Sequence, residues 1–349
     1  MTVIKKALAA TSIACLFLTN GFSKELFSID AGFKSAYRDG YITEYVYSNN
    51  LLGKSKKLSQ LDWNIKNTFQ LGGTLQFNLP WFYVNFGASG TIPQNSGRMY
   101  DSDWQNLTST KTDYSINENQ IISGLSLDFQ IKGKIPVFKK LVIRPSFGLS
   151  FEKIHFETKN IEGWYGSKIL DSSGHLLERP APVSYKNPDA VHFPTENNIK
   201  LSPVEYESQN LYTWLGGDFE YKPFDFLSAY VGAYFSPFVY HFSIDSHWNN
   251  TEKTIISSYY MDEIFSNFNA AKIQAGISYS PIKNLFVNAD FFWVRFYESF
   301  GDTYSSKRKS SGYSKISGSN SGADSNHITI NLSVTYRFFN LIRTDKIRR

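Results

Sequence analysis

Long runs in which apolar and polar residues alternate constrain this chain more than any other feature. From Ile328 to Phe338 the even-numbered residues are apolar or aromatic and the odd-numbered residues are polar. The runs around Ile121 and Leu141 alternate in a similar way. Because successive side chains of a strand point to opposite faces, each run predicts a strand with one apolar and one polar face.

Two kinds of connection separate these runs. Short turns are expected at residues 78–81, 133–136, 221–224 and 280–283, and long polar loops at about 47–57, 93–115, 159–205, 249–258 and 301–325. Short turns that alternate with long loops are typical of an up-and-down barrel in an outer membrane, with its turns on the periplasmic side. Four turns and five loops join ten strands. We therefore expect an all-β, ten-stranded antiparallel transmembrane β-barrel with both termini in the periplasm.

Composition agrees with this fold class. Aromatic residues make up 17% of the chain, and no run after the N-terminus reaches the roughly 18 apolar residues of a membrane helix. A soluble β-sandwich also alternates and remains the alternative fold. A pore is the less favoured function for a barrel, because the narrow lumen of ten strands is expected to be filled by side chains such as Arg144, Glu152 and Asp128.

The N-terminus, residues 1–23, has the pattern of a secretory signal peptide. Lys5 and Lys6 precede an apolar core at residues 7–18, and the small residue Ser23 suits a cleavage site. A lipoprotein signal with lipidated Cys15 is the alternative. Cys15 is the single cysteine of the chain, so cleavage after Ser23 would exclude disulfides, thiolate metal sites and a cysteine nucleophile.

The mature chain divides into a barrel domain at residues 24–339 and a basic C-terminal tail at residues 340–349. Without Lys5 and Lys6 the 36 basic residues become 34, against 31 acidic residues, which leaves a net charge of +3. The tail alone accounts for that excess. A barrel without net positive charge argues against nucleic acid as a partner.

One predicted strand is too long for a bilayer. The 22 residues of Leu58–Leu79 span about 73 Å and would rise on the order of 50 Å when tilted, whereas the apolar band of such barrels is about 25 Å tall. The barrel should therefore protrude above the membrane at its loop end. Asp101 with Asp103, and Asp245 with His247, are pairs at spacing two near that end. Each pair should share one face of its strand.

The strand that leads to Asp245 changes parity along its length. Its apolar positions are odd-numbered in Leu227–Phe235 and even-numbered in Tyr240–Ile244. A one-residue slip moves every following side chain to the other face of a strand. The sequence therefore predicts a β-bulge near Ser236 and Pro237 that turns the upper part of this strand.

These segments resemble the omptin family of outer-membrane endopeptidases, and the resemblance runs along most of the mature chain. The segments that carry it are Lys57–Trp63, Gly97–Trp104, Asp245–His247 and Leu332–Phe338. The first two segments are specific, whereas an Asp-x-His pair alone is weak. The family is a ten-stranded barrel with its site in an extracellular cleft, which agrees with the strand count reached from the turns.

The resemblance implies a catalytic role for four residues. His247 and Asp101 would hold and activate a water that attacks the peptide carbonyl, and Asp245 would orient His247 and stabilise its protonated form. Asp103 would couple to Asp101 and raise one apparent pKa of the pair. Without the resemblance, Asp101 to Asp103 is more often a turn or a weak calcium ligand set, and His247 is a solvated residue at a strand end.

The resemblance also implies a pocket for a basic side chain before the scissile bond. Glu44 matches one of the two acids of that pocket, but the position of the second acid is occupied by Ser243. The loss of one carboxylate predicts cleavage after Arg or Lys with reduced selectivity. Met99 lies two residues before Asp101 and is expected to line the cleft; core packing is the alternative.

Lipopolysaccharide is the activator that the resemblance implies, with no other cofactor and no metal ion. Lys153 and His155 share the outward parity of Phe151 and are the candidates for contact with its phosphates, although residues 206–210 lack the basic residue expected beside them. The expected partners are protein or peptide substrates and the barrel-assembly machinery, and the expected state is a monomer. The alternative function is a surface adhesin or host-protein-binding barrel with weak or no proteolysis.

Overall fold

A computed structural model describes residues 25–49, 55–105, 109–170, 176–179, 181–193, 203–248 and 256–342. The predicted signal peptide, Cys15 and the last seven residues of the predicted tail lie outside these ranges. No helix among the described residues combines the length and the hydropathy that crossing a membrane requires.

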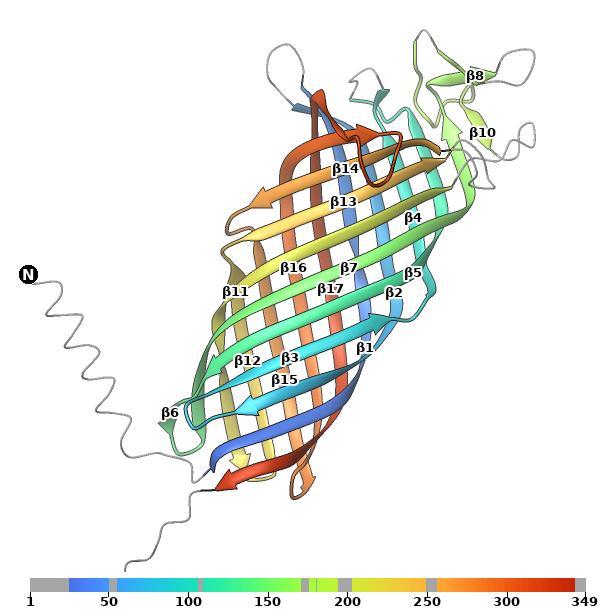
Figure 1. Cartoon of the computed structure of the whole chain (residues 1–349). Coiled ribbons are helices and arrows are strands. Elements are labelled where there is room, and N and C mark those ends of the chain that lie inside the picture. Colours follow the sequence, from blue (N-terminus) through green and yellow to red (C-terminus); the bar gives the residue numbers. More distant parts are fainter. Residues whose placement is uncertain are drawn as a thin grey trace, which may run out of the picture.

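The described chain is an antiparallel sheet that closes into a barrel, in which β1 pairs with both β2 and β17 (Figure 1). The main strands are β1 (Glu25–Asn49), β2 (Ser55–Asn78), β3 (Phe82–Thr91), β4 (Gln94–Asp103), β5 (Asp113–Gly133), β6 (Ile135–Phe138), β7 (Leu141–Tyr165), β11 (Val204–Phe224), β12 (Leu227–Ser236), β13 (Val239–Trp248), β14 (Ile256–Ser266), β15 (Ala270–Ile282), β16 (Leu285–Ser306) and β17 (Ser314–Ile342). Three short strands, β8 (Lys168–Leu170), β9 (Leu176–Glu178) and β10 (Val191–Phe193), belong to the connection between β7 and β11.

Ten walls form the ring, because β3 with β4, β12 with β13, and β14 with β15 each occupy one position. The prediction of a ten-stranded antiparallel barrel is therefore confirmed. Glu25 at the start of β1 pairs with Ile342 at the end of β17, so the first and last strands meet at one end of the barrel. β17 thus continues three residues beyond Phe339, the predicted end of the barrel domain.

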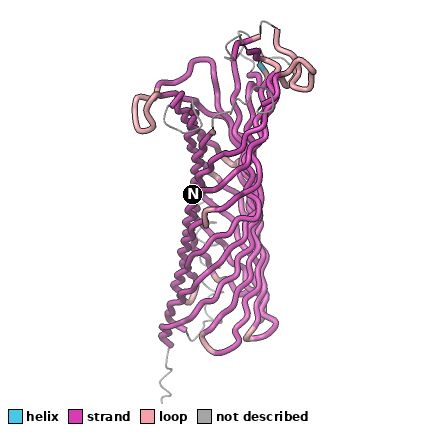
Figure 2. Tube along the Cα trace, turned by 90° about the vertical axis from the view of Figure 1, so that its right-hand side faces the viewer, coloured by secondary structure: helices cyan, strands magenta, loops and turns pink. Residues whose placement is uncertain are grey.

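The short turns gather at the end where β1 begins and β17 ends, and the long connections gather at the opposite end (Figure 2). The first predicted turn, between β2 and β3, is confirmed. The other three turns lie a few residues later than predicted, because Pro136, Pro223 and Pro281 are inside strands. Each of these prolines sits at a register shift, where a missing backbone N–H is tolerated.

The long connections are shorter than the sequence predicts. Residues 93–115 were expected to form a loop, but β4 and the start of β5 occupy most of them. In the same way, β16 extends to Ser306 and β17 begins at Ser314, within the expected loop at 301–325. The strands therefore continue well towards the loop end, which we call the outer end.

Exposed aromatic rings mark the part of the barrel that faces lipid. Near the outer side of this band lies the upper aromatic girdle, Phe235, Phe238, Tyr240, Phe265 and Phe268, whose rings contact one another in pairs. Near the turns lie Trp81, Phe138, Phe224 and Phe226. Such girdles flank the apolar band of outer-membrane barrels. The strands continue beyond the upper girdle, which agrees with a barrel that protrudes above the membrane.

Charged side chains cross-link the interior of the membrane-spanning part. Arg144 pairs with Asp218, and Arg38 pairs with Glu152 at 2.9 Å. Arg38, Arg144 and Glu152, together with Asp128, line a cavity of about 720 Å³. The side chains expected to fill the lumen thus point into it.

Candidate active site

β4 carries the first predicted pair beyond the upper girdle. Asp101 lies opposite Leu61 of β2 and Ser115 of β5, and Asp103 follows two positions later. Burial and then the charge of Asp103 raise the pKa of Asp101 well above its ordinary value. Burial likewise raises the pKa of Asp103 to about 6. The two carboxyls therefore lie close together in a poorly solvated place, where one of them readily keeps a proton.

β13 carries the second predicted pair, and the chain is interrupted just before it at Pro237 and Phe238. Between the pairs Leu215 with Phe235 and Tyr212 with Val239, this wall has one residue more than β11. Exposed side chains are odd-numbered in β12, whereas the odd-numbered side chains of β13 are mostly buried. The predicted bulge is confirmed, and it turns Asp245 and His247 into the barrel.

His247 and Asp245 form a hydrogen-bonded pair through Nε2 and Oδ2. The carboxylate is 6% exposed, whereas the imidazole is 42% exposed and its ring meets the ring of Tyr260 edge-on at 5.2 Å between centroids. The ring is thus held from two sides and still reaches solvent. This is the arrangement that a base needs if it is to take a proton from a bound water.

The two pairs act on each other across the interior. Burial lowers the pKa of His247, but Asp245 and then Asp101 and Asp103 outweigh this effect and raise it to about 9. In return, the charge of His247 lowers the pKa of Asp101. The structure therefore brings all four predicted residues into one electrostatic unit.

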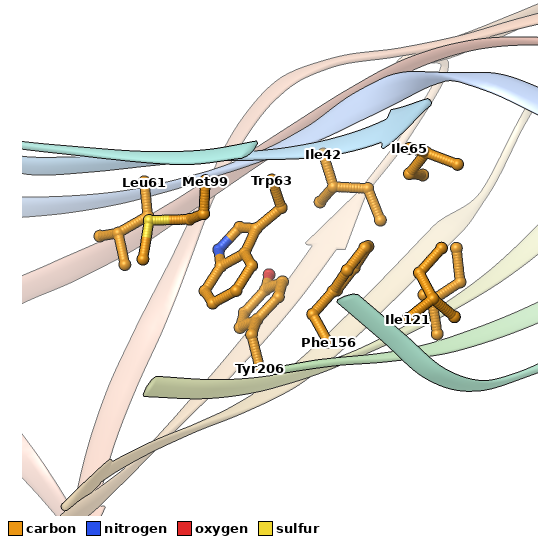
Figure 3. Close-up of a cluster of buried hydrophobic side chains, with 9 residues drawn as sticks. Ile42, Leu61, Trp63, Ile65, Met99, Ile121, Phe156 and Tyr206 are labelled. Carbon is orange, nitrogen blue, oxygen red and sulfur yellow. The ribbon is translucent and has the colours of Figure 1, made fainter. Parts of the chain in front are cut away.

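A cluster of buried apolar side chains (Figure 3) borders this unit from below, and its member Leu61 is paired with Asp101. Trp63 of β2 stacks on Tyr206 of β11 at 5.1 Å between ring centroids, with Phe156 of β7 beside them at 5.5 Å from Trp63. Met99, which was expected to line the cleft, is buried in this cluster and accepts a hydrogen bond from Asn117 Nδ2 at 3.5 Å. Its main contribution is therefore to support the site from below.

Acidic side chains from other walls face the same space. Glu44, predicted as part of the substrate pocket, is buried, and burial followed by the charges of Asp245, Asp262 and Asp101 raises its pKa. Asp262 of β14 was missed by the sequence analysis. It is paired with Ser243 of β13, and burial followed by the charge of Asp245 raises its pKa to about 7.

The predicted lipopolysaccharide contacts lie on the outer surface, as their parity indicates. Lys153 pairs with Glu207 at 2.9 Å, and Nε2 of His155 lies 3.6 Å from a carboxylate oxygen of Glu205. Both acids belong to β11, the neighbouring wall. Each candidate base therefore already has an acidic neighbour on this face.

The described residues add no ligands to the calcium alternative. Within the described ranges, no group of three or more His, Cys, Asp or Glu side chains has the arrangement of a metal site. The acidic residues of the site are instead spread over β1, β4, β13 and β14.

Comparison with known proteins identifies the family. The model of the omptin family matches residues 27–338. The plasminogen activator of Yersinia pestis is 23% identical over 291 residues, which cover 81% of this chain and 82% of the relative. Outer membrane protease OmpP of Escherichia coli (strain K12) is 24% identical over 272 residues, 76% of each chain.

A solved structure agrees at the level of the fold. The crystal structure of outer membrane protease OmpT from Escherichia coli matches with a TM-score of 0.71 and 19% identity, over 92% of this chain and 100% of that chain. The family match spans nearly the whole barrel, including β4 and β13. The chain thus belongs to the omptin family, and it is an outer-membrane protease whose active site faces the outside of the cell.

Proposed function

We propose that this protease cleaves extracellular proteins or peptides with a water molecule activated between Asp101 and His247. The supporting observation is the mutual electrostatic effect of the two pairs, which come from walls far apart in the sequence. A water between a carboxylate and an imidazole can donate a hydrogen bond to each. It is then oriented for attack on a carbonyl carbon.

In this mechanism the neutral imidazole of His247 takes a proton as the water oxygen bonds to the carbonyl carbon. Asp245 stabilises the resulting imidazolium through their hydrogen bond. The proton then passes to the leaving amine as the C–N bond breaks, which restores the neutral imidazole. Asp103 contributes because two charges on the neighbouring carboxyl groups of Asp101 and Asp103 repel each other, so that one of the two groups keeps a proton. No covalent intermediate with the enzyme is formed.

We also propose that cleavage follows basic residues, with the side chain entering the space beside Glu44. That carboxylate is buried, and Oε2 has no hydrogen-bond partner among the described residues. A substrate guanidinium or ammonium group would supply the missing partner. Lipopolysaccharide is proposed as the activator, in contact with the outer surface near Lys153 and His155, where the acidic neighbours Glu207 and Glu205 weaken the attraction of each base for a lipid phosphate.

A direct assay tests the reaction. The refolded protein with lipopolysaccharide is offered quenched peptides that contain Arg-Arg, Arg-Val or Ala-Ala bonds. We expect cleavage after Arg, and a loss of kcat/KM of roughly 100-fold or more in Asp101→Ala and in His247→Ala. Glu263→Gln, on the outer face of β14, is the control and should cleave normally.

Equal turnover in the wild type and both variants would rule out this mechanism. The adhesin alternative makes a different prediction, because a binding barrel would retain an extracellular protein without cutting it. Mass analysis of the peptides after incubation separates the two functions.

A further inference from the structure

Ser243 and Asp262 are cross-strand neighbours inside the outer part of the barrel. They are directly paired between β13 and β14, and both are buried. Side chains that lie opposite each other on antiparallel strands share a face, with Cβ atoms about 4.5–5.5 Å apart. A carboxylate at position 262 can therefore reach nearly the same space as one at position 243.

Asp262 and Glu44 approach this space from different walls. The charge of Asp262 acts on the carboxyl group of Glu44, although β1 and β14 are not neighbours in the sheet. Glu44 is 3% exposed and Asp262 is 4% exposed. Oε2 of Glu44 and Oδ1 of Asp262 have no hydrogen-bond partner among the described residues. Each carboxyl group thus keeps one unpartnered oxygen, and the groups that act on them as donors, Trp63 on Glu44 and Thr303 on Asp262, are neutral.

The described part of the chain supplies no cation for these acids. Neither Glu44 nor Asp262 forms an ion pair with a described lysine or arginine. The charges that act on these two carboxyl groups come from other acids, and the charge of Asp245 acts on both. Buried carboxylates without a partner are costly, and native proteins normally pair them. A cation that arrives with the substrate would supply such a partner.

We propose that Asp262 is a specificity-determining residue that, together with Glu44, binds the Arg or Lys side chain preceding the scissile bond. This inference rests on the proposed function and adds a residue to its pocket. Asp262 takes the place of the carboxylate that is absent at position 243. The hydroxyl of Ser243 is smaller than a carboxylate and leaves room for the substrate side chain between the two walls.

An arginine side chain suits this geometry. The guanidinium carries five N–H donors in one plane, so it can donate to two carboxylates on different sides. With two acids in the pocket, selectivity for basic residues is strict. The reduced selectivity expected from Ser243 alone would follow only if Asp262 does not reach the substrate.

The test compares peptides that differ only in the residue before the scissile bond, which is Arg, Lys, citrulline or Ala. Citrulline keeps the shape of Arg but has no charge. For the wild type we expect kcat/KM to favour Arg over citrulline by roughly 100-fold or more, and for Asp262→Asn we expect this ratio to fall roughly 10- to 100-fold. Asp302→Asn is the matched control, because Asp302 pairs with Lys315 on the adjacent wall and should leave the ratio unchanged.

A swapped variant tests the position of the carboxylate separately from its removal. Ser243→Asp combined with Asp262→Ser keeps a second acid beside Glu44 in the pocket and should retain the Arg-to-citrulline ratio within about threefold of the wild type. An unchanged ratio in folded Asp262→Asn overturns the proposal. A folded swap that loses the ratio also overturns it, and this variant answers the question even if Asp262→Asn does not fold.

Failure of the proposed function has a different signature. If the wild type cleaves none of the peptides, the proposed proteolysis is wrong. Calorimetry of the binding of an arginine amide then tests the pocket without any cleavage. The inference requires weaker binding to Asp262→Asn than to the wild type, by roughly tenfold or more. Equal binding overturns it.

Discussion

His247 on β13 hydrogen-bonds to Asp245, the residue two positions before it on the same strand. The bulge at Pro237 turns both side chains into the barrel. Burial acts to lower the pKa of His247, whereas the neighbouring carboxylates raise it to about 9. The proton affinity of the proposed base is therefore set by its acidic neighbours.

The first prediction concerns the pH profile of cleavage. If the neutral imidazole accepts the proton, kcat/KM should rise with pH towards about 9, where His247 loses its proton. Asp245→Asn removes the strongest opposing effect, so burial should shift the rise to lower pH by more than one unit. The maximal rate should fall roughly 100-fold or more. Initial rates between pH 5 and pH 10 measure both effects.

Glu263→Gln serves as the control for this profile, since Glu263 lies on the outer face and hydrogen-bonds to Tyr240. Its profile should match that of the wild type. A rise at the same pH in Asp245→Asn and the wild type would show that His247 is not the group that titrates.

The second prediction concerns lipopolysaccharide. Because Lys153 is already paired with Glu207 at 2.9 Å, Lys153→Ala should change the lipopolysaccharide concentration for half-maximal activity by only about threefold or less. Glu207→Gln frees the ammonium group and should lower that concentration. Titration of lipopolysaccharide against peptide cleavage measures both variants. A large loss in Lys153→Ala would show that the lysine exchanges its partner for a lipid phosphate.

The membrane-spanning part could be predicted closely from the sequence, because lipid on one side enforces alternation. β17 and β7 show this pattern directly. The outer part faces water on its exterior, so that constraint disappears: Gln94–Asp103 forms β4 without an apolar alternation. Proline gives a different kind of error: Pro223 and Pro281 predict turns, but both lie at register shifts near the ends of strands.

The candidate site was predictable only where its residues share a strand. Spacing two places Asp245 and His247 on one face without knowledge of their neighbours. Asp262 could not be found in this way, because its pairing with Ser243 depends on the register between β13 and β14. That register depends in turn on the extra residue at Pro237. Which walls face each other depends on how the whole barrel closes, and the sequence of a single strand does not determine this.

The third prediction concerns stability. The pKa of Asp262 is about 7 in the folded protein, and about 3.9 is typical of an unfolded chain. Between these two pH values Asp262 is ionised in the unfolded chain but still protonated in the folded protein. The free energy of unfolding therefore falls as pH rises, and the whole decrease is present above about pH 7. Burial and then the charge of Asp245 on β13 raise this pKa, against a hydrogen bond with Thr303 of β16. Asp262→Asn should therefore increase the free energy of unfolding by about 1–3 kcal/mol at pH 8 and change it little at pH 4.

Urea unfolding followed by circular dichroism at the two pH values measures this difference. Asp302→Asn is again the matched control, and its effect should not grow with pH in this way. If Asp262→Asn stabilises the protein equally at pH 4 and pH 8, ionisation of Asp262 does not destabilise the folded protein.

The last prediction concerns the floor of the site. Trp63 is fully buried and stacks between β2 and β11 on Tyr206, so Trp63→Ala should lower the free energy of unfolding by about 3–5 kcal/mol. Trp63→Phe keeps an aromatic face on Tyr206 and should cost only about 1–2 kcal/mol. Trp81→Ala is the control, because Trp81 is 56% exposed at the turn end.

Cleavage of the Arg peptide should follow the same order, because the floor holds the walls that carry Asp101 and Glu44 in register. Leu61, also in the buried cluster, is paired with both of these acids, so a collapsed floor displaces them together. Trp63→Ala should therefore lose more activity than Trp63→Phe at a temperature where both remain folded. Full activity in folded Trp63→Ala would show that the strands alone hold the site in place.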